Sequence, residues 1–267
     1  MNAIQPCALL LLVGPDWQVE AVSANVAMLG DYRPLSVVGQ PLGDLIGSKA
    51  IHNLRNRMAW LASDESEVQD FGAQWGDVNF DLRATREEDW HLVEAELAVE
   101  PRLSDGIGIV RSMSDRLAGR DPSAMAEQAV RQIAALTGFE QIILADRQGQ
   151  PIASNCNRSG LTQLPLVDNT RLIADCAAEP VPIVGDVDNR LIARATYLAP
   201  DKGRCDRLLE MGMAASMELP LRIDGEQVAS LHGFHPSARR IGAERRSVAH
   251  LFAERLVARM ARQGWQY

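Results

Sequence analysis

The chain has 267 residues, of which 46% are hydrophobic and 23% are charged, and its formal net charge at pH 7 is −8. This composition is typical of a globular protein long enough to bury its own core, and it excludes an intrinsically disordered chain. The negative charge argues against a broad nucleic-acid-binding or membrane-binding surface, so we expect neither as a partner.

The N-terminal sequence predicts a cytoplasmic protein. Its one early apolar run, residues 8–13, is closed by Gly14-Pro15-Asp16 and is too short for a secretory signal or a membrane span. The cysteines form no C-x-x-C pair, which is typical of free intracellular thiols. They are Cys7, Cys156, Cys176 and Cys205.

The first hundred residues alternate apolar runs with turns. Apolar residues at helical spacing, from Ile51 to Leu61, predict an amphipathic helix over 48–62. The expected strands are 8–13 and 18–23, joined as a hairpin, then 80–84 and 91–99. Antiparallel strands with short helices on one side predict an α+β sheet domain over residues 1–103.

A second domain is expected after a connecting segment at 104–120. Asp121 and Pro122 predict a helix start, because aspartate caps free N–H groups and proline at the first position loses no hydrogen bond; Gly138 predicts its end. Strands are expected at 141–145 and 151–155.

The rest of this domain, which we place at 121–267, is less regular. Residues 156–207 have little periodicity and predict a binding region or a mobile lid. Asp224-Gly225 predicts a hairpin turn between strands 216–223 and 226–234. Apolar residues four apart predict a helix over 243–262 that serves either as a dimer seam or as packing on its own sheet. Its polar face carries Arg245, Arg246, Arg255, Arg259 and Arg262.

Catalytic motifs are missing from the sequence. There is no phosphate-binding G-x-x-x-x-G-K loop, no G-x-G-x-x-G after a strand and no G-x-S-x-G elbow. His232 and His235 lack acidic or thiol companions at the spacing of a metal site. We therefore expect a protein that is not an enzyme and binds no metal through these residues.

Several segments together resemble the PAS–GAF photosensory core of bacterial phytochromes. In the first domain, I-Q-P-C-A-L-L at 4–10 and G-Q-P-L at 39–42 are similar to the opening of the PAS domain. In the second, the similar segments are V-R at 130–131, L-T-G-F at 136–139, R-L-I-A-D at 171–175, P-V-P at 180–182 and M-G-M-A-A-S-M at 211–217. The resemblance covers nearly the whole chain and implies a PAS-like domain at 1–103 and a GAF domain at 121–267.

The resemblance implies a sensory module that holds a linear tetrapyrrole of the biliverdin type in the GAF pocket. Arg171 and Arg194 would bind its two propionates, because a guanidinium donates two parallel hydrogen bonds to a carboxylate. His235 would meet the outer ring. Other positions matched to the pocket are Arg204, where the family has a histidine, and Met211 and Ser216 in the M-G-M-A-A-S-M segment.

Departures from the family pattern exclude its covalent attachment. The attachment cysteine lies upstream of the family's PAS domain, whereas Cys7 stands where the family has a histidine. The segment whose aspartate serves the pyrrole nitrogens is missing before Arg171, and the N-terminal arm looks too short for the family's figure-of-eight knot. No output domain follows before Tyr267. We therefore expect non-covalent binding and signalling through a separate partner protein.

Two other functions stay open. The chain can be a ligand-free adaptor that forms a homodimer through its GAF helices, with the 243–262 helix as the working surface. It can also bind haem through His235, His232 or Cys205.

Overall fold

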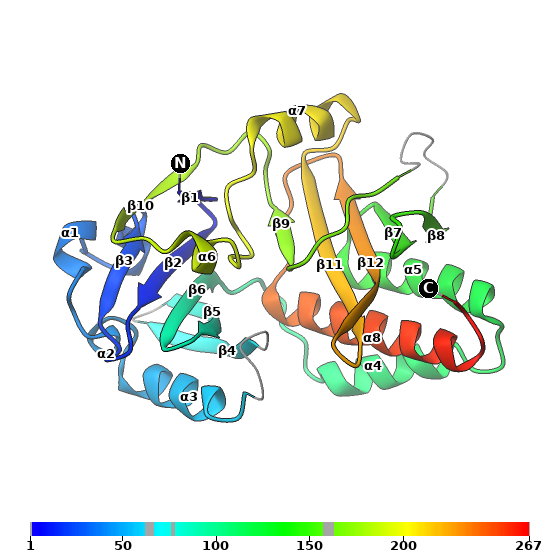
Figure 1. Ribbon diagram of the computed structural model, residues 1–267, viewed down its shortest axis with the longest axis horizontal. Coiled ribbons are helices and arrows are strands. Elements are labelled where there is room, and N and C mark those ends of the chain that lie inside the picture. Colours follow the sequence, from blue (N-terminus) through cyan, green and yellow to red (C-terminus); the bar gives the residue numbers. More distant parts are fainter. Residues whose placement is uncertain (1, 62–66, 76–77, 157–162, 267) are drawn as a thin grey trace. The chain divides into compact units, whose positions relative to one another are not determined.

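The computed structural model describes residues 2–61, 67–75, 78–156 and 163–266, which form two compact units. The first comprises Met1–Ala98 together with Ala178–Ala199; the second comprises Val99–Ala177 and Pro200–Tyr267. Both combine antiparallel strands with helices, so the predicted α+β class with two domains is confirmed (Figure 1).

The first unit is built on a seven-stranded sheet of order β1-β10-β3-β2-β6-β5-β4, in which every described pairing is antiparallel. The strands are β1 (Ala3–Ile4), β2 (Ala8–Val13), β3 (Val19–Ser23), β4 (Glu67–Trp75), β5 (Val78–Glu87), β6 (Trp90–Leu97) and β10 (Val181–Gly185). The helices are η1 (Val26–Leu29), α1 (Pro34–Val37), α2 (Leu42–Ile46), α3 (Ser48–Met58) and α6 (Asn189–Ile192).

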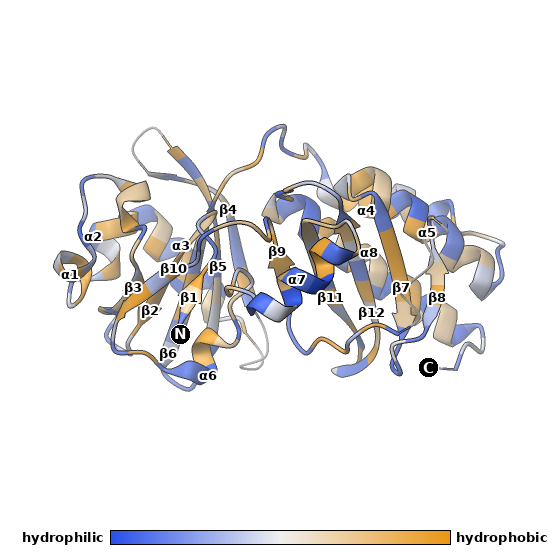
Figure 2. Ribbon diagram, turned by 90° about the horizontal axis from the view of Figure 1, so that it is seen from above, coloured by the Kyte–Doolittle hydropathy of each residue, from blue (hydrophilic) through white to orange (hydrophobic). Residues whose placement is uncertain are grey.

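Strand β2 is apolar throughout because both faces of the sheet are covered. On one face Leu9 and Leu11 pack with α3 and the other N-terminal helices. On the opposite face Leu10 and Leu12 pack with Leu191 and its neighbours on α6. Figure 2 shows the resulting concentration of hydrophobic residues along β2 and β3. The sequence predicted helices on one side only; the second cover comes from residues 178–199.

The predicted N-terminal hairpin is confirmed by the pairing of β2 with β3. Helix α3 ends at Met58 rather than at the predicted residue 62, which lies outside the described residues. Strand β4 was not predicted. Its sequence, E-V-Q-D-F-G-A-Q-W, mixes polar and apolar residues without regular alternation, and its register against β5 is irregular between Asp70 and Ala73.

The second unit contains a five-stranded antiparallel sheet of order β8-β7-β12-β11-β9. The strands are β7 (Gln141–Asp146), β8 (Pro151–Ser154), β9 (Arg171–Ile173), β11 (Ala215–Ile223) and β12 (Glu226–His235). The helices are α4 (Gly106–Asp115), α5 (Pro122–Thr137), α7 (Lys202–Glu210) and α8 (Ala243–Arg262). The hairpin β11–β12 and the bounds of α8 agree with the sequence prediction.

Helix α5 has the predicted ends. The Asp121 carboxylate accepts a hydrogen bond from the Ala124 N–H at 2.9 Å, and Gly138 closes the helix in the left-handed region at φ 69°. Helix α8 packs on β11, β12, α4 and α5, and its Phe252 is fully buried. Packing on its own sheet, one of the two roles predicted for α8, is therefore observed.

Of the five arginines predicted to form a basic face on α8, Arg255 and Arg262 are exposed, whereas the other three make contacts within the unit. Arg246 is buried and donates to the Ile241 carbonyl. Arg245 donates to the Pro101 carbonyl at 2.9 Å, and Arg259 donates to the Ser114 carbonyl at 3.2 Å. These guanidinium groups tie α8 to the preceding segment of the same unit.

The domain limits differ from the predicted ones in two places. Residues 104–120, expected to be a connecting segment, contain α4, which packs against α8; the Leu103 N–H also donates to the Glu244 carboxylate at 2.8 Å. Residues 178–199, expected within the second domain, belong to the first unit because β10 pairs with β1 and β3. We call residues 178–199 the excursion.

Candidate functional site

A cleft of about 430 Å³ lies in the second unit between α7, the 163–165 segment and the sheet. This volume is within the range of small-molecule sites, about 300–1,000 Å³. Its apolar lining comes from Leu164, Pro165, Leu208, Met211 and Phe234. Its polar lining comes from Gln163, Asp201, Arg204, Arg207, Glu210 and Glu218.

Local structure explains how these side chains meet. The Asp201 side chain caps α7 by accepting from the Arg204 N–H at 2.9 Å. Residues three and four apart share one side of a helix, so Arg204, Arg207 and Leu208 line the cleft together. On β11 the alternation of side chains places Glu218 on the same face of the sheet as Ser216, and Glu218 lines the cleft.

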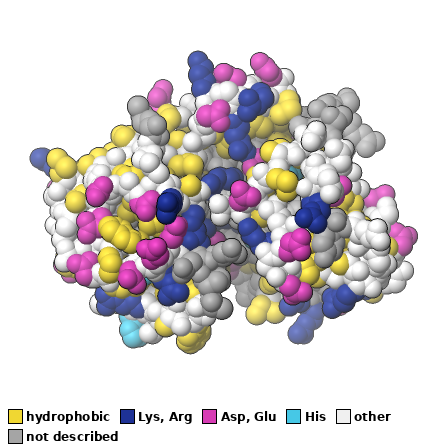
Figure 3. Space-filling model, in the orientation of Figure 1, with side chains coloured by type: hydrophobic (Ala, Val, Ile, Leu, Met, Phe, Trp, Pro, Cys, Tyr) yellow, Lys and Arg dark blue, Asp and Glu magenta, His cyan; other side chains and the backbone are white. Residues whose placement is uncertain are grey.

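A buried carboxylate defines the electrostatics of the cleft. Glu218 is only 3% exposed and forms an ion pair with the Arg204 guanidinium through its Oε1. Its Oε2 has no hydrogen-bond partner among the described residues. Arg207, also on α7, is exposed, and Figure 3 shows basic and acidic side chains on the surface over this helix. The cleft therefore offers one unfilled acceptor and a second cation.

His232 lies opposite Glu218 on the neighbouring strand and is fully buried. Its Nε2 is 2.8 Å from the Ser230 hydroxyl, and its Nδ1 has no partner among the described residues. Burial, with a smaller contribution from the Arg204 charge, lowers the pKa of His232 to about 4. His232 is thus a neutral histidine at neutral pH.

Arg204 and Met211 are the predicted site residues that line the cleft. Arg171 begins β9, pairs in register with Glu218, and donates from Nη1 to the Thr170 carbonyl at 3.4 Å. Ser216 is buried between Ile173 and Phe234 on the adjoining strands. Neither Arg171 nor Ser216 is among the described residues of the cleft lining.

His235 ends β12 and is held by its own turn. Its Nδ1 accepts from the Ser237 N–H at 3.2 Å and lies 3.1 Å from the Ser237 hydroxyl. The imidazole is edge-on to Phe139, with ring centroids 6.3 Å apart. Within the described part of the chain, His235 does not line the cleft.

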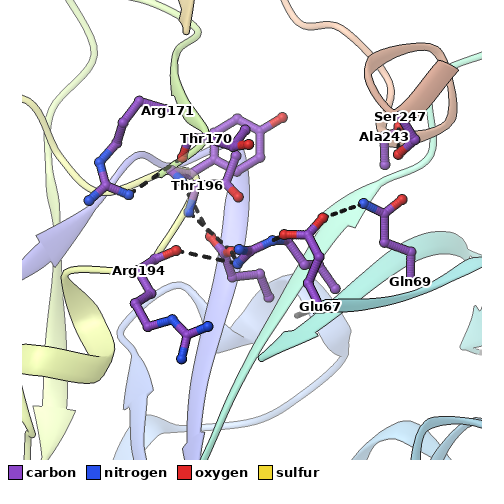
Figure 4. Close-up of polar contacts among 11 residues, drawn as sticks. Glu67, Gln69, Thr170, Arg171, Arg194, Thr196, Ala243 and Ser247 are labelled. Carbon is purple, nitrogen blue, oxygen red and sulfur yellow. Dashed lines mark hydrogen bonds and ion pairs between the residues drawn. The ribbon is translucent and has the colours of Figure 1, made fainter. Parts of the chain in front are cut away.

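Arg194 departs from its predicted place because it belongs to the excursion in the first unit. Its Nη1 donates to the Arg86 carbonyl at 2.7 Å. Its own carbonyl accepts from Arg83 at 3.4 Å (Figure 4). Arg171 and Arg194 therefore lie in different units. The expectation that both arginines belong to one GAF pocket is not met by the fold of the second unit.

The excursion holds the N-terminal strand on both edges. Strand β10 pairs with β1, and on the other side Leu198 bridges to Ile4. The Gln5 N–H donates to the Tyr197 carbonyl at 2.9 Å, and the Ala199 N–H donates to the Ala3 carbonyl at 3.0 Å. The sequence predicted that the family's knot is lost, but an excursion that clasps the first strand is present.

A buried polar network fastens the excursion to the sheet. Arg83 forms ion pairs at 2.7 Å with both Glu67 and Glu94. Glu94 also accepts from the N–H groups of Thr196 and Tyr197 at 3.1 and 3.2 Å. Burial opposes the charge of Arg83, but the two carboxylates outweigh that effect, so the pKa of Arg83 is raised. Figure 4 shows Glu67, Arg194 and Thr196 around this network.

The described residues contain no group of three or more histidine, cysteine, aspartate or glutamate side chains able to hold a metal ion. None of the described helices combines the length and apolar character needed to cross a membrane.

Sequence reasoning missed the residues at the centre of the cleft. Glu218, Arg207, Leu208 and Phe234 were not among the predicted site residues, although two signals pointed to them. Arg207 follows Arg204 by three residues on a helix, and Glu218 follows Ser216 by two on a strand. The prediction placed residues 156–207 in an irregular segment, so the helical side of α7 was not recognised.

Comparison with known proteins identifies the fold. Residues 1–98 match the model of a family described as PAS fold, whereas no curated protein matches the chain. The chromophore-binding domain of phytochrome P1 from Stigmatella aurantiaca is 20% identical, with a TM-score of 0.78 over 96% of this chain and 95% of that one. The corresponding domain of an unusual bacteriophytochrome from R. palustris is 21% identical, with a TM-score of 0.77 over 98% and 95% of the two chains.

The predicted resemblance is thereby confirmed. The chain has the fold of bacteriophytochrome chromophore-binding domains, with a PAS domain in the first unit and a GAF domain in the second. It also matches the longer photosensory core module of the S. aurantiaca phytochrome, at 19% identity, and spans 58% of that chain.

Proposed function

We propose that this chain, with the fold of bacteriophytochrome chromophore-binding domains, is a sensory module that binds a linear tetrapyrrole of the biliverdin type in the α7 cleft without a covalent bond. The observation that carries the proposal is Glu218, a buried carboxylate with one oxygen paired to Arg204 and the other without a partner among the described residues. An unfilled buried acceptor is costly unless a ligand donor satisfies it.

The side chains of the cleft fit the chemistry of such a ligand. Pyrrole N–H groups would donate to Glu218, and Leu208, Met211 and Phe234 would pack against the flat apolar surface. Arg207 would bind a propionate, because the Arg204 guanidinium is already paired with Glu218. When bound, a linear tetrapyrrole supplies absorption of visible light.

Absorption spectroscopy tests this proposal. The full chain is mixed with biliverdin, or separately with haem, and passed through gel filtration. We expect a visible band that stays with the protein after biliverdin. Arg207→Ala and Glu218→Gln should each weaken binding about tenfold or more, since each removes a charge-assisted hydrogen bond. Arg131→Ala, at an exposed position on α5, is the matched control and should bind like the unmodified chain.

The other outcomes are equally informative. A protein that stays colourless with both ligands contradicts tetrapyrrole binding, and a band seen with haem alone supports the haem alternative. A biliverdin band that is unchanged in both cleft variants but weaker in Arg194→Ala would contradict the cleft as the site. It would support binding through Arg194, the arginine predicted from the sequence.

A second candidate, a homodimeric adaptor, is favoured by two exposed apolar side chains on the packed helices α4 and α8. Ile107 is 75% exposed and Leu251 is 42% exposed. In either case we propose that the chain acts in the cytoplasm, forms a homodimer through these GAF helices, and passes its signal to a separate protein without catalysing a reaction itself.

Light scattering tests the dimer. Changing both Ile107 and Leu251 to aspartate should shift the mass from dimer to monomer, because it places charges in an apolar contact. Leu35→Asp, at a residue 80% exposed on α1, is the control and should leave the mass unchanged. A monomeric unmodified chain at all concentrations would refute the adaptor.

A further inference from the structure

Two of the four cysteines lie together in the second unit. Cys176 follows β9 and is half-buried, whereas Cys205 lies on α7 and is buried. The Cys176 side chain packs on the apolar cluster that includes Leu208 and Met213. Cys205 lies one turn before Leu208 on the same buried side of α7, and the two thiols interact. The Cys176 N–H donates to the Ala214 carbonyl at 2.8 Å, which fixes the backbone beneath one of the two sulfur atoms.

These two cysteines bracket the excursion along the chain. The chain leaves the second unit after Ala177 and returns at Pro200, so the whole of residues 178–199 lies between Cys176 and Cys205. A bond between their sulfur atoms would close a ring that contains β10 and residues 197–199, the two limbs that hold strand β1.

We propose that Cys176 and Cys205 form a reversible dithiol–disulfide pair that a peroxide-class oxidant converts into a covalent clasp around the base of the excursion. Because Cys176 packs against the buried side of α7 that carries both Cys205 and Leu208, the two sulfur atoms need only a short approach to reach the S–S bond length of about 2.05 Å. Cys205 also lies on the helix that lines the cleft, so the bond would fix α7 to the segment after β9.

The chemistry is balanced with hydrogen peroxide as the oxidant. Burial raises the pKa of Cys176 to about 12, so Cys176 keeps its proton until it reacts with its oxidised partner. The Cys205 thiol takes one oxygen from peroxide, giving a sulfenic acid and one water. Cys176 then attacks that sulfur; the S–S bond forms, and its proton leaves with the hydroxyl group as water. A dithiol reductant reverses the reaction.

The test uses the full chain treated with one equivalent of hydrogen peroxide at neutral pH. Remaining thiols are alkylated, the chain is digested, and the peptides are measured by mass spectrometry. We expect a cross-linked peptide joining Cys176 to Cys205, a fall from four titratable thiols to two, and restoration of all four by dithiothreitol. The Cys7→Ser, Cys156→Ser double variant is the matched control and should give the same cross-link.

The ring should also stabilise the chain. Closing a long loop restricts the unfolded state, so the thermal midpoint of the oxidised protein should rise by roughly 5 °C or more. Amide exchange at Gln5, whose N–H donates to the Tyr197 carbonyl, should slow on oxidation. Cys176→Ser and Cys205→Ser should lose both effects. Four alkylated thiols after peroxide treatment of the unmodified chain, or a cross-link through Cys7 or Cys156, would overturn the proposal.

Discussion

Replacing Glu94 by alanine is expected to lower the free energy of unfolding by about 3–5 kcal/mol, the cost of breaking a buried ion pair from one side. Glu94 is only 4% exposed, and it accepts from the Arg83 guanidinium and from the N–H groups of Thr196 and Tyr197. Its loss leaves a buried charge with Glu67 as its remaining carboxylate partner and removes the acceptor of two N–H groups. Urea unfolding of the full chain measures the effect.

Two control variants test whether the loss of stability depends on the burial of the carboxylate. Glu67 also pairs with Arg83 but its side chain is 34% exposed, so Glu67→Ala should cost less. Glu127 pairs with Arg131 at 4.0 Å on the surface of α5, and Glu127→Ala should change stability by less than about 1 kcal/mol. In Glu94→Ala the amides of Thr196 and Tyr197 should also exchange faster. Equal stabilities for Glu94→Ala and Glu127→Ala would show that the network does not fasten the excursion.

Acidification from pH 6.5 to pH 4 is expected to remove about 3 kcal/mol of stability through His232 alone. Burial lowers the folded-state pKa of His232 from 6.5 to about 4. Between pH 6.5 and pH 4, His232 is therefore mostly protonated in the unfolded chain and mostly neutral in the folded chain. The stabilisation is fully present above pH 6.5, falls between pH 6.5 and 4, and falls no further once both states are protonated. His91 is shifted in the same direction, by burial and by the Arg86 charge.

Unfolding by urea across this pH range isolates the contribution of His232. His232→Gln removes the titrating group, so its stability should decline less steeply below pH 6.5 than that of the unmodified chain, even if it starts lower. His52→Gln, at an exposed residue of α3, is the control and should keep the original slope. An unchanged slope in His232→Gln would mean that folding does not lower the pKa of His232.

Local signals were sufficient for much of the architecture. The Asp121 cap and Gly138 end of α5, the Asp224-Gly225 hairpin and the apolar spacing of α8 each depend on residues within a few positions of one another, and each was predicted correctly. The ordered series of motifs further identified the bacteriophytochrome fold, which the solved structures confirm.

The candidate site was only partly accessible from the sequence. Motif matching placed Arg204 and Met211 in the cleft, but it also assigned Arg194 to the second domain. An alignment of motifs gives the order of residues along the chain, but it does not show which sheet a segment joins. Glu218 was missed because an acidic residue inside an apolar strand has no local pattern that marks its partner on α7.

The sequence by itself determined many of the helices and strands, the fold class and the order of the two domains, because helix caps, turns and periodicity act over short separations. The tertiary structure alone decided that residues 178–199 complete the first sheet, that Glu94 fastens them, and that Cys176 meets Cys205. The Glu94 and β10 contacts join residues roughly a hundred or more positions apart, and all three depend on how distant segments pack, for which the chain carries no local period.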